Sequence, residues 1–144
     1  MDIFQSMKIS SSALQAQQIR LNTISSNLAN IETTRTPEGG PYRKKSVIFR
    51  TVNQPAFDQQ LASSLQEGAR GVEVARITTD NRPPKTIYDP SHPDADSAGY
   101  VAFPDINLLE EIADLMSATR TYEANVTVIK SAKRMALKAL DIGK

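Results

Sequence analysis

The stretch IFQSMKISSSALQAQQIRLNTISSNLANI, residues 3–31, decides the fold of this chain. No Gly or Pro occurs before Pro37, so no residue in this stretch breaks a helix. Alternating steps of four and three residues from Ile3 to Ile31 meet seven apolar side chains in nine positions. This spacing predicts one long helix whose narrow apolar stripe suits one or two partner helices. Its other face carries Gln, Ser, Asn and Thr with few charges, which is unusual for a surface in water.

A second helix with the same kind of stripe is predicted at the other end of the chain, beginning near Ile106. Asn107 is a favourable N-cap, and Glu110 follows it at capping-box spacing. Steps of four and three from Leu108 to Leu140 meet eight apolar or aromatic side chains in ten positions, uninterrupted by Gly or Pro. We therefore predict a mainly α fold with a small β insert, in which the two long terminal helices form an antiparallel coiled-coil-like pair.

The segment between the helices is predicted to hold short strands joined by loops. Residues 33–41 collect Thr, Pro and Gly, which are typical of turns. Val, Ile, Thr and aromatic residues then favour strands at 42–52, 71–79 and 99–103. We expect three parts: an N-terminal helix in residues 1–32, a loop-rich β insert in residues 33–104 and a C-terminal helix in residues 105–144.

The charge balance and the missing residue types exclude several classes of function. The chain carries 17 Lys and Arg against 16 Asp and Glu. Phosphate binding needs a concentrated excess of cations, so we expect no nucleic-acid partner. The chain has no Cys and a single His, and it lacks a G-x-S-x-G motif. We therefore expect neither an enzyme nor a small-molecule substrate or cofactor.

Membrane insertion and a cleaved signal peptide are not expected either. No apolar run approaches the ~20 residues that a helix needs to cross a bilayer. The first residues, from Met1 to Gln5, hold no basic region followed by an apolar stretch. If the protein leaves the cytoplasm, another export route must carry it.

The sharpest cluster of candidate metal ligands is the loop from Asp89 to Asp96, which holds three carboxylates and the only His. Such a cluster suits a cation, so a metal-binding module is one alternative function. The spacing does not match an EF-hand, because no Gly and no closing Glu stand at the required places. We favour the competing interpretation, a turn-rich loop in which Pro fixes φ and Asp side chains bond their own backbone.

Residues 12–17 (SALQAQ) and 20–30 (RLNTISSNLAN) resemble the N-terminal signature of flagellar rod and hook axial proteins. That signature reads S-x-L-x-A-Q-x-x-L-N-x-x-S-x-N-L-A-N and is followed by a Thr-rich turn. Ile31-Glu32 departs from it, since relatives more often carry small or Asn residues there. The resemblance covers nearly the whole chain except residues 53–70. Five downstream segments are most similar to the proximal rod members: TTRTPEGGPYR (33–43), GVEV (71–74), YDPSHPDAD (88–96), GYV (99–101) and RTYEANV (120–126).

The resemblance implies a structural subunit of the flagellar basal-body proximal rod, the drive shaft of flagellum-dependent motility. It implies a helical assembly whose partners are copies of the chain, other proximal and distal rod subunits, the rod-to-ring adaptor and the export gate. It also implies a place in the rod where the rod crosses the periplasm, reached by type III export without a cleaved signal peptide. A soluble coiled-coil export adaptor stays open as an alternative.

The assembly interface is predicted along both helical stripes and at two Asn side chains of the N-terminal helix. The uncharged polar face of that helix fits this interpretation, because it can exchange hydrogen bonds with neighbouring copies. The predicted interface residues are Met7, Leu14, Leu21, Ile24, Asn27, Leu28, Asn30, Leu108, Ile112, Leu115, Tyr122, Val126, Ile129 and Leu140.

Overall fold

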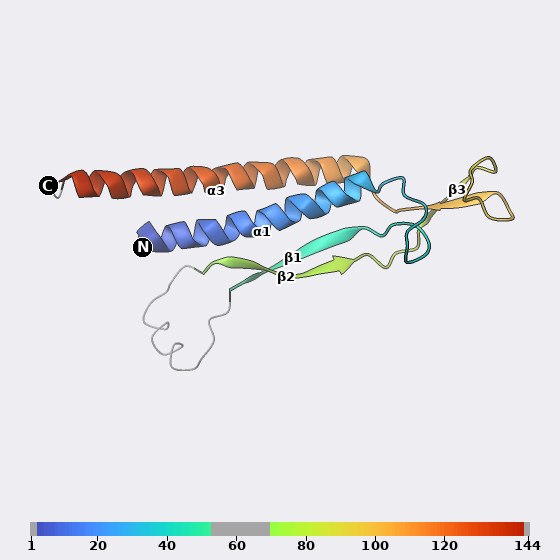
Figure 1. The fold of residues 1–144 in the computed structure, drawn as a ribbon, viewed down its shortest axis with the longest axis horizontal. Helices are drawn as coiled ribbons and strands as arrows, with labels where there is room; N and C mark the ends of the chain where they lie inside the picture. Colours follow the sequence, from blue (N-terminus) through green and yellow to red (C-terminus); the bar gives the residue numbers. More distant parts are fainter. Residues whose placement is uncertain (1–2, 53–69, 143–144) are drawn as a thin grey trace, which may run out of the picture.

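The computed structural model describes residues 3–52 and 70–142 of the chain as an elongated molecule dominated by two helices (Figure 1). Helix α1 spans Ile3–Ala29 and helix α3 spans Leu108–Ile142. The described residues between the helices form four strands: β1 (Lys45–Thr51), β2 (Val72–Thr79), β3 (Lys85–Tyr88) and β4 (Tyr100–Phe103).

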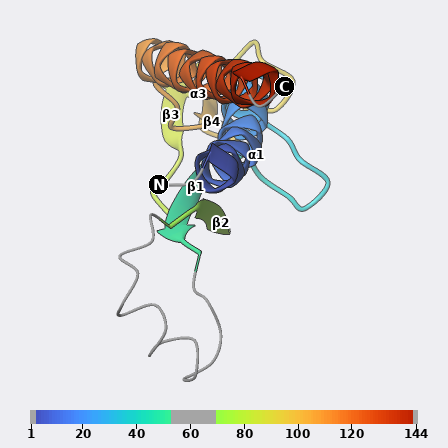
Figure 2. The ribbon, with the colours of Figure 1, turned by 90° about the vertical axis from the view of Figure 1, so that its left-hand side faces the viewer.

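The molecule has three layers, with α1 lying between α3 and the hairpin of β1 and β2 (Figures 1 and 2). The two helices run antiparallel, and α1 is the only described helix or strand that packs on α3. The hairpin packs on another side of α1. The predicted fold class, an antiparallel pair of long helices with a small β segment between them in sequence, is confirmed. As a consequence, α1 is covered on two sides and α3 on one.

The strands form two separate antiparallel pairs. β1 pairs with β2, with a register shift between Ile48 and Phe49, and β3 pairs with β4 at the end of the molecule far from both termini (Figure 1). β3 was not predicted, because closely spaced prolines flank it and its hydrogen bonds come from a partner strand. Gly99 precedes β4 with a φ of 81°, and a Cβ there would meet Cε2 of Tyr88 at 2.9 Å, so this turn requires Gly.

The start of α3 is capped as predicted, because the backbone N–H of Leu109 donates to Oδ1 of Asn107 at 3.1 Å. Glu110, the expected capping-box partner, instead lies 3.6 Å from Nζ of Lys44.

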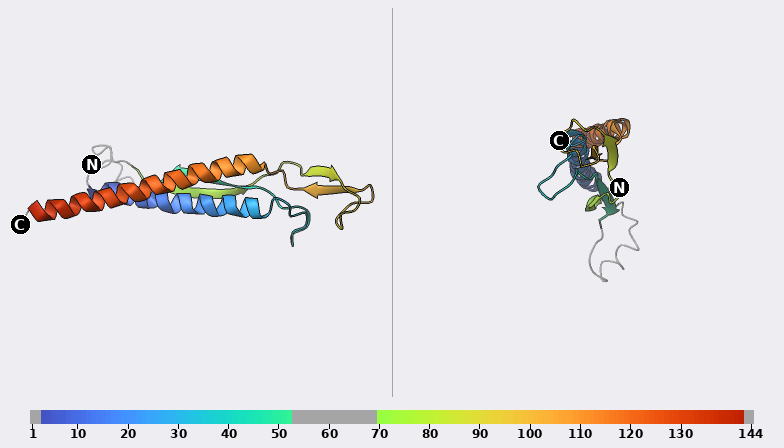
Figure 3. Two further views of the ribbon diagram at one scale, coloured as in Figure 1. Left: turned by 90° about the horizontal axis from the view of Figure 1, so that it is seen from above. Right: turned by 90° about the vertical axis from the view of Figure 1, so that its right-hand side faces the viewer.

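α3 has 35 residues and α1 has 27, and the C-terminal end of α3 extends past the start of α1 (Figure 3). No helix in the part of the chain that the structure describes is long and apolar enough to cross a membrane.

The hydrophobic core is small and built mainly from short side chains. Ala16 and Ile24 of α1 and Ala118 and Ala132 of α3 are buried, as is Val101 of β4. Most larger apolar side chains of α3 stay outside this core. The chain therefore leaves much of its apolar surface in contact with water.

Candidate assembly surface

The side of α3 that faces α1 is marked by its least exposed residues. Glu111, Ala118 and Ala132 are buried, and α1 is the only described helix or strand that can cover them. Short Ala side chains let the two backbones come close, because the distance between packed helices depends on the side chains at the contact. Half-buried residues continue the same spacing of four and three residues between Glu111 and Ala132 and once past Ala132. They are Leu115, Tyr122, Asn125, Ile129 and Ala136.

We call this line of covered residues, from Glu111 to Ala136, the seam. It is rotated about the helix axis from the apolar stripe that the sequence predicted. Leu108, Ile112 and Leu140 lie off the seam and are 49%, 40% and 68% exposed. The prediction followed large apolar side chains, whereas the seam uses Ala118 and Ala132 at its tightest points. The large side chains are therefore left on the open sides of the helix. The positions that the stripe and the seam share are Leu115, Tyr122, Ile129 and Ala136.

Asn27 joins three segments of the chain near the end of α1. Its Nδ2 donates to the backbone oxygen of Lys45 at 2.8 Å and to Oε2 of Glu111 at 3.0 Å. Its Oδ1 accepts hydrogen bonds from the backbone N–H of Lys45 at 2.9 Å and from the hydroxyl of Tyr42 at 3.1 Å. Asn27 was predicted to face neighbouring subunits, but it is 1% exposed. Its amide is used inside the chain, where it satisfies the backbone of Lys45 and a buried carboxylate.

The carboxylate that Asn27 contacts belongs to a buried ion pair. Glu111 is 1% exposed, and its Oε1 lies 2.7 Å from Nζ of Lys44. Burial lowers the pKa of Lys44, but the hydrogen bond and charge of Glu111, with Glu110, outweigh burial and raise this pKa above its ordinary value. Lys44 is therefore held in its charged form beside the Glu111 carboxylate. The junction ties the end of α1 and the start of β1 to the start of α3.

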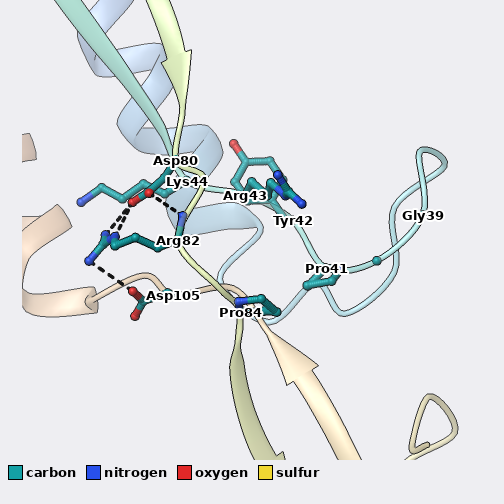
Figure 4. A pocket seen from close by; sticks show the side chains of 10 residues that line it. Gly39, Pro41, Tyr42, Arg43, Lys44, Asp80, Arg82, Pro84 and Asp105 are labelled. Carbon is teal, nitrogen blue, oxygen red and sulfur yellow. Dashed lines mark hydrogen bonds and ion pairs between the residues drawn. The ribbon is translucent and has the colours of Figure 1, made fainter.

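A more exposed set of ion pairs holds the loop after β2 near the segment that leads into α3 (Figure 4). Arg82 lies 2.6 Å from Asp80 and 3.2 Å from Asp105. Backbone and side-chain hydrogen bonds from Arg82 hold the pKa of Asp80 below its ordinary value. The cavity beside these residues measures about 80 Å³. Because the ion pairs face water, they position the loops and add little stability.

The loop considered as a metal site uses two of its three carboxylates in its own turns and the third in a contact with another loop. Asp89 accepts a hydrogen bond from the backbone N–H of Ser91, and Asp96 accepts from two backbone N–H groups. Asp94 accepts from the hydroxyl of Thr34 at 2.8 Å. Within residues 3–52 and 70–142, no three His, Asp or Glu side chains gather in a group that could hold a metal ion. The turn interpretation accounts for this loop.

Large apolar side chains stay exposed on the outer sides of α3. By contrast, Phe4 is the only large apolar side chain of α1 that is exposed among the described residues. An apolar surface of this extent is typical of a site where another protein binds. The exposed apolar residues of α3 are Leu108, Leu109, Ile112, Met116, Val128, Met135, Leu137, Leu140 and Ile142.

The other predicted interface residues are at least partly covered within the chain. Ile24 is buried, and the remaining ones are half-buried: Met7, Leu14, Leu21, Leu28, Asn30, Leu115, Tyr122, Val126 and Ile129. Several exposed residues of α3 were not predicted, because a single stripe was followed along the helix. Counting apolar residues separately on each helix face would have found them. The residues missed were Leu109, Met116, Val128, Met135, Leu137 and Ile142.

Comparison with known proteins places these two helices in a family. A model described as "Flagella basal body rod protein" matches residues 7–35, and one described as "Flagellar basal body rod FlgEFG protein C-terminal" matches residues 97–142. "Flagellar basal-body rod protein FlgC" of Borreliella burgdorferi is 46% identical, over 99% of this chain and 98% of the relative. The protein of that name from Bacillus subtilis is 43% identical over the whole of both chains. The chain belongs to the flagellar basal-body rod protein family.

Family membership gives the structural features a function. The chain is a structural subunit of the flagellar basal-body rod, and its role in motility follows from its place in the flagellum. The two matched segments contain most of α1 and all of β4 and α3. The segments that match the family models therefore include most of α1 and the whole of α3, the helix that carries the exposed apolar residues of this chain.

Proposed function

We propose that this rod subunit belongs to the proximal rod and builds the wall of the tube through its two terminal helices. Its curated relatives support the position in the rod, because several of them carry the same FlgC name and match over nearly their full length. On this proposal the segments 1–32 and 105–144 form the wall. The insert of residues 33–104 lies outside it, with the β1–β2 hairpin supporting α1.

The single observation that carries the assembly role is the apolar surface that α3 leaves uncovered. A helix that packs on one partner should expose mainly polar residues on its other sides. Here Leu109 is 77% exposed and Met116 is 53% exposed, away from the seam with α1. Covering these side chains with neighbouring subunits contributes favourable free energy at about 25 cal/mol per Å² of apolar area.

The proposed partners follow from the same surface. Copies of the chain and other rod subunits cover α3, while the rod-to-ring adaptor and the export gate contact the assembled rod. The proposed location is the part of the basal-body rod that crosses the periplasm. The interface residues proposed from the sequence are kept except Asn27, whose hydrogen bonds are made inside the chain.

The test is to replace an exposed apolar residue of α3 with a charged one and to measure both folding and assembly. We expect Met116→Asp to abolish swimming and rod incorporation, because a carboxylate at a buried contact between subunits lacks a partner. The free energy of unfolding of the isolated subunit should change by less than about 0.5 kcal/mol, as is usual for an exposed site.

The matched control is Ser117→Asp, at the next position on the same exposed helix. It adds the same charge without removing an apolar side chain, so it should leave swimming close to normal. A strain with Met116→Asp that assembles rods and swims as well as the control strain would contradict the proposal.

A further inference from the structure

Within residues 3–52 and 70–142, no helix lies beside the last turns of α3. Asn27 of α1 contacts Glu111 of α3, and Arg20 contacts Asp114, so the helices pair antiparallel from the start of α3. Because both helices rise 1.5 Å per residue, the start of α1 lies beside roughly residue 133 of α3. Residues 134–142, here called the overhang, extend beyond that point (Figure 3).

The overhang exposes large apolar side chains in several directions. Met135, Leu137, Leu140 and Ile142 are all more than half exposed, and Ile142 is 86% exposed. Successive residues turn by 100°, so Met135 and Leu137 point to nearly opposite sides of the helix. Apolar side chains that point to several sides of a helix are normally covered by more than one contact. One neighbouring surface can therefore cover only part of the overhang.

The charges near the overhang restrict the chemistry of that partner. Lys133, Arg134 and Lys138 lie in or beside it, against one carboxylate, Asp141. A complementary surface is apolar and carries acidic groups at its rim, because opposite charges across an interface set its orientation and exclude wrong partners.

A surface with this chemistry lies at the beginning of α3. Between Asp105 and Met116 the sequence has four carboxylates and no cation. Glu111 is buried, while the side chains of Asp105, Glu110 and Asp114 are 47%, 61% and 45% exposed. Their ion pairs within the chain are exposed and therefore weak enough to be shared with a neighbour. The exposed apolar residues beside them are Leu108, Leu109, Ile112 and Met116.

We propose that the overhang docks on the start of the C-terminal helix of the next subunit of the rod family. This inference rests on the proposed function, because it takes assembly through α3 as given. Both complementary surfaces lie within residues 97–142, the segment that matches the family model, and every copy of this chain presents both of them. The two surfaces lie about 26 residues apart, which corresponds to a step of roughly 39 Å along the helix. A head-to-tail contact between different surfaces gives an open, repeating assembly when its rotation does not close into a ring, and a rod requires such an assembly.

The contact is tested by photo-crosslinking in assembled basal bodies. The photoreactive residue p-benzoylphenylalanine replaces Leu140, the basal bodies are purified and irradiated, and crosslinked peptides are identified by mass spectrometry. We expect crosslinks to the first three turns of the C-terminal helix of a rod-family subunit. The control position is Lys85 in β3, at the opposite end of the molecule, which should give no crosslinks to that helix start.

A charge reversal adds a second measurement. Lys138→Glu should lower the yield of the Leu140 crosslink by about five-fold or more, because it places like charges across the contact. The matched control is Lys130→Glu, an exposed cation of α3 before the overhang, which should change the yield by less than about two-fold.

The outcomes separate this inference from the proposed function. If the subunit is found in purified rods but the Leu140 crosslinks map to a strand, an N-terminal helix or a protein outside the family, the docking inference is wrong and the assembly role stands. Equal loss of yield in both charge variants also contradicts the docking inference. If the subunit is missing from purified rods, both proposals fail.

Discussion

At the scale of single residues, Asn27 and Glu111 leave water almost completely although both are polar. Glu111 faces Lys44 at 2.7 Å, and Asn27 makes four hydrogen bonds to groups from two other segments. A buried ion pair often adds little net stability, but removing one partner is costly because the other charge stays buried. Since these partners are far apart in the sequence, the junction specifies one alignment of α1, β1 and α3.

We predict that Glu111→Ala lowers the free energy of unfolding by about 3 kcal/mol, because Lys44 and Asn27 lose a buried partner. The measurement is urea denaturation of the purified subunit followed by circular dichroism. Glu110→Ala is the control, since Glu110 is exposed and lies 3.6 Å from the same Lys44. It should cost less than about 1 kcal/mol. Equal losses in the two variants would show that the buried pair does not hold the junction.

Residue roles were the least predictable part of this chain. Asn27 is part of a polar helix face, and nothing in the local pattern distinguishes an amide that meets a neighbouring subunit from one that meets Lys45 of the same chain. Glu111 sits beside Glu110 in the sequence, yet one carboxylate is buried and the other exposed. That difference depends on which side of α3 faces α1 after folding, and this is a property of the tertiary structure.

At the scale of elements, prediction from the sequence was far more successful, for a physical reason. Long stretches without Gly or Pro and with helical spacing form helices in most contexts, and β-branched runs between turn residues form strands. The ends of α1 and α3 therefore lie within a few residues of the predicted ones. The facing surfaces were harder to predict, because a seam built on Ala118 and Ala132 depends on close backbone approach, which apolar periodicity does not report.

The Ala seam gives a prediction for helix packing. Ala118→Leu should lower the free energy of unfolding by about 2 kcal/mol, because the larger side chain forces α1 and α3 apart. Ala113→Leu adds the same atoms at an exposed position of α3 and should change stability by less than about 0.5 kcal/mol. Thermal unfolding of both variants measures the difference. Equal stability of the two variants would contradict the assignment of Ala118 to the seam.

At the scale of the whole molecule, the three layers cover the two helices to different extents. α1 is enclosed by α3 and the β1–β2 hairpin, so it supports the subunit. α3 packs on α1 alone among the described helices and strands and carries nine exposed large apolar side chains. The subunit is therefore completed by its neighbours, which is consistent with a structural component whose free energy gain comes on assembly.

Hydrogen exchange at the overhang should measure how far the subunit depends on its neighbours. A nine-residue helix end without a packing partner is marginal in water, so amides of residues 134–142 should exchange in the isolated subunit at nearly the rate of an unfolded chain. Residues 111–132 form the seam with α1 and should be protected in the same sample. In assembled rods the overhang should become protected by about a hundred-fold or more, because neighbouring subunits then bury it. Protection of the overhang in the monomer would mean that it has a partner within its own chain, and lack of protection in rods would mean that no subunit covers it.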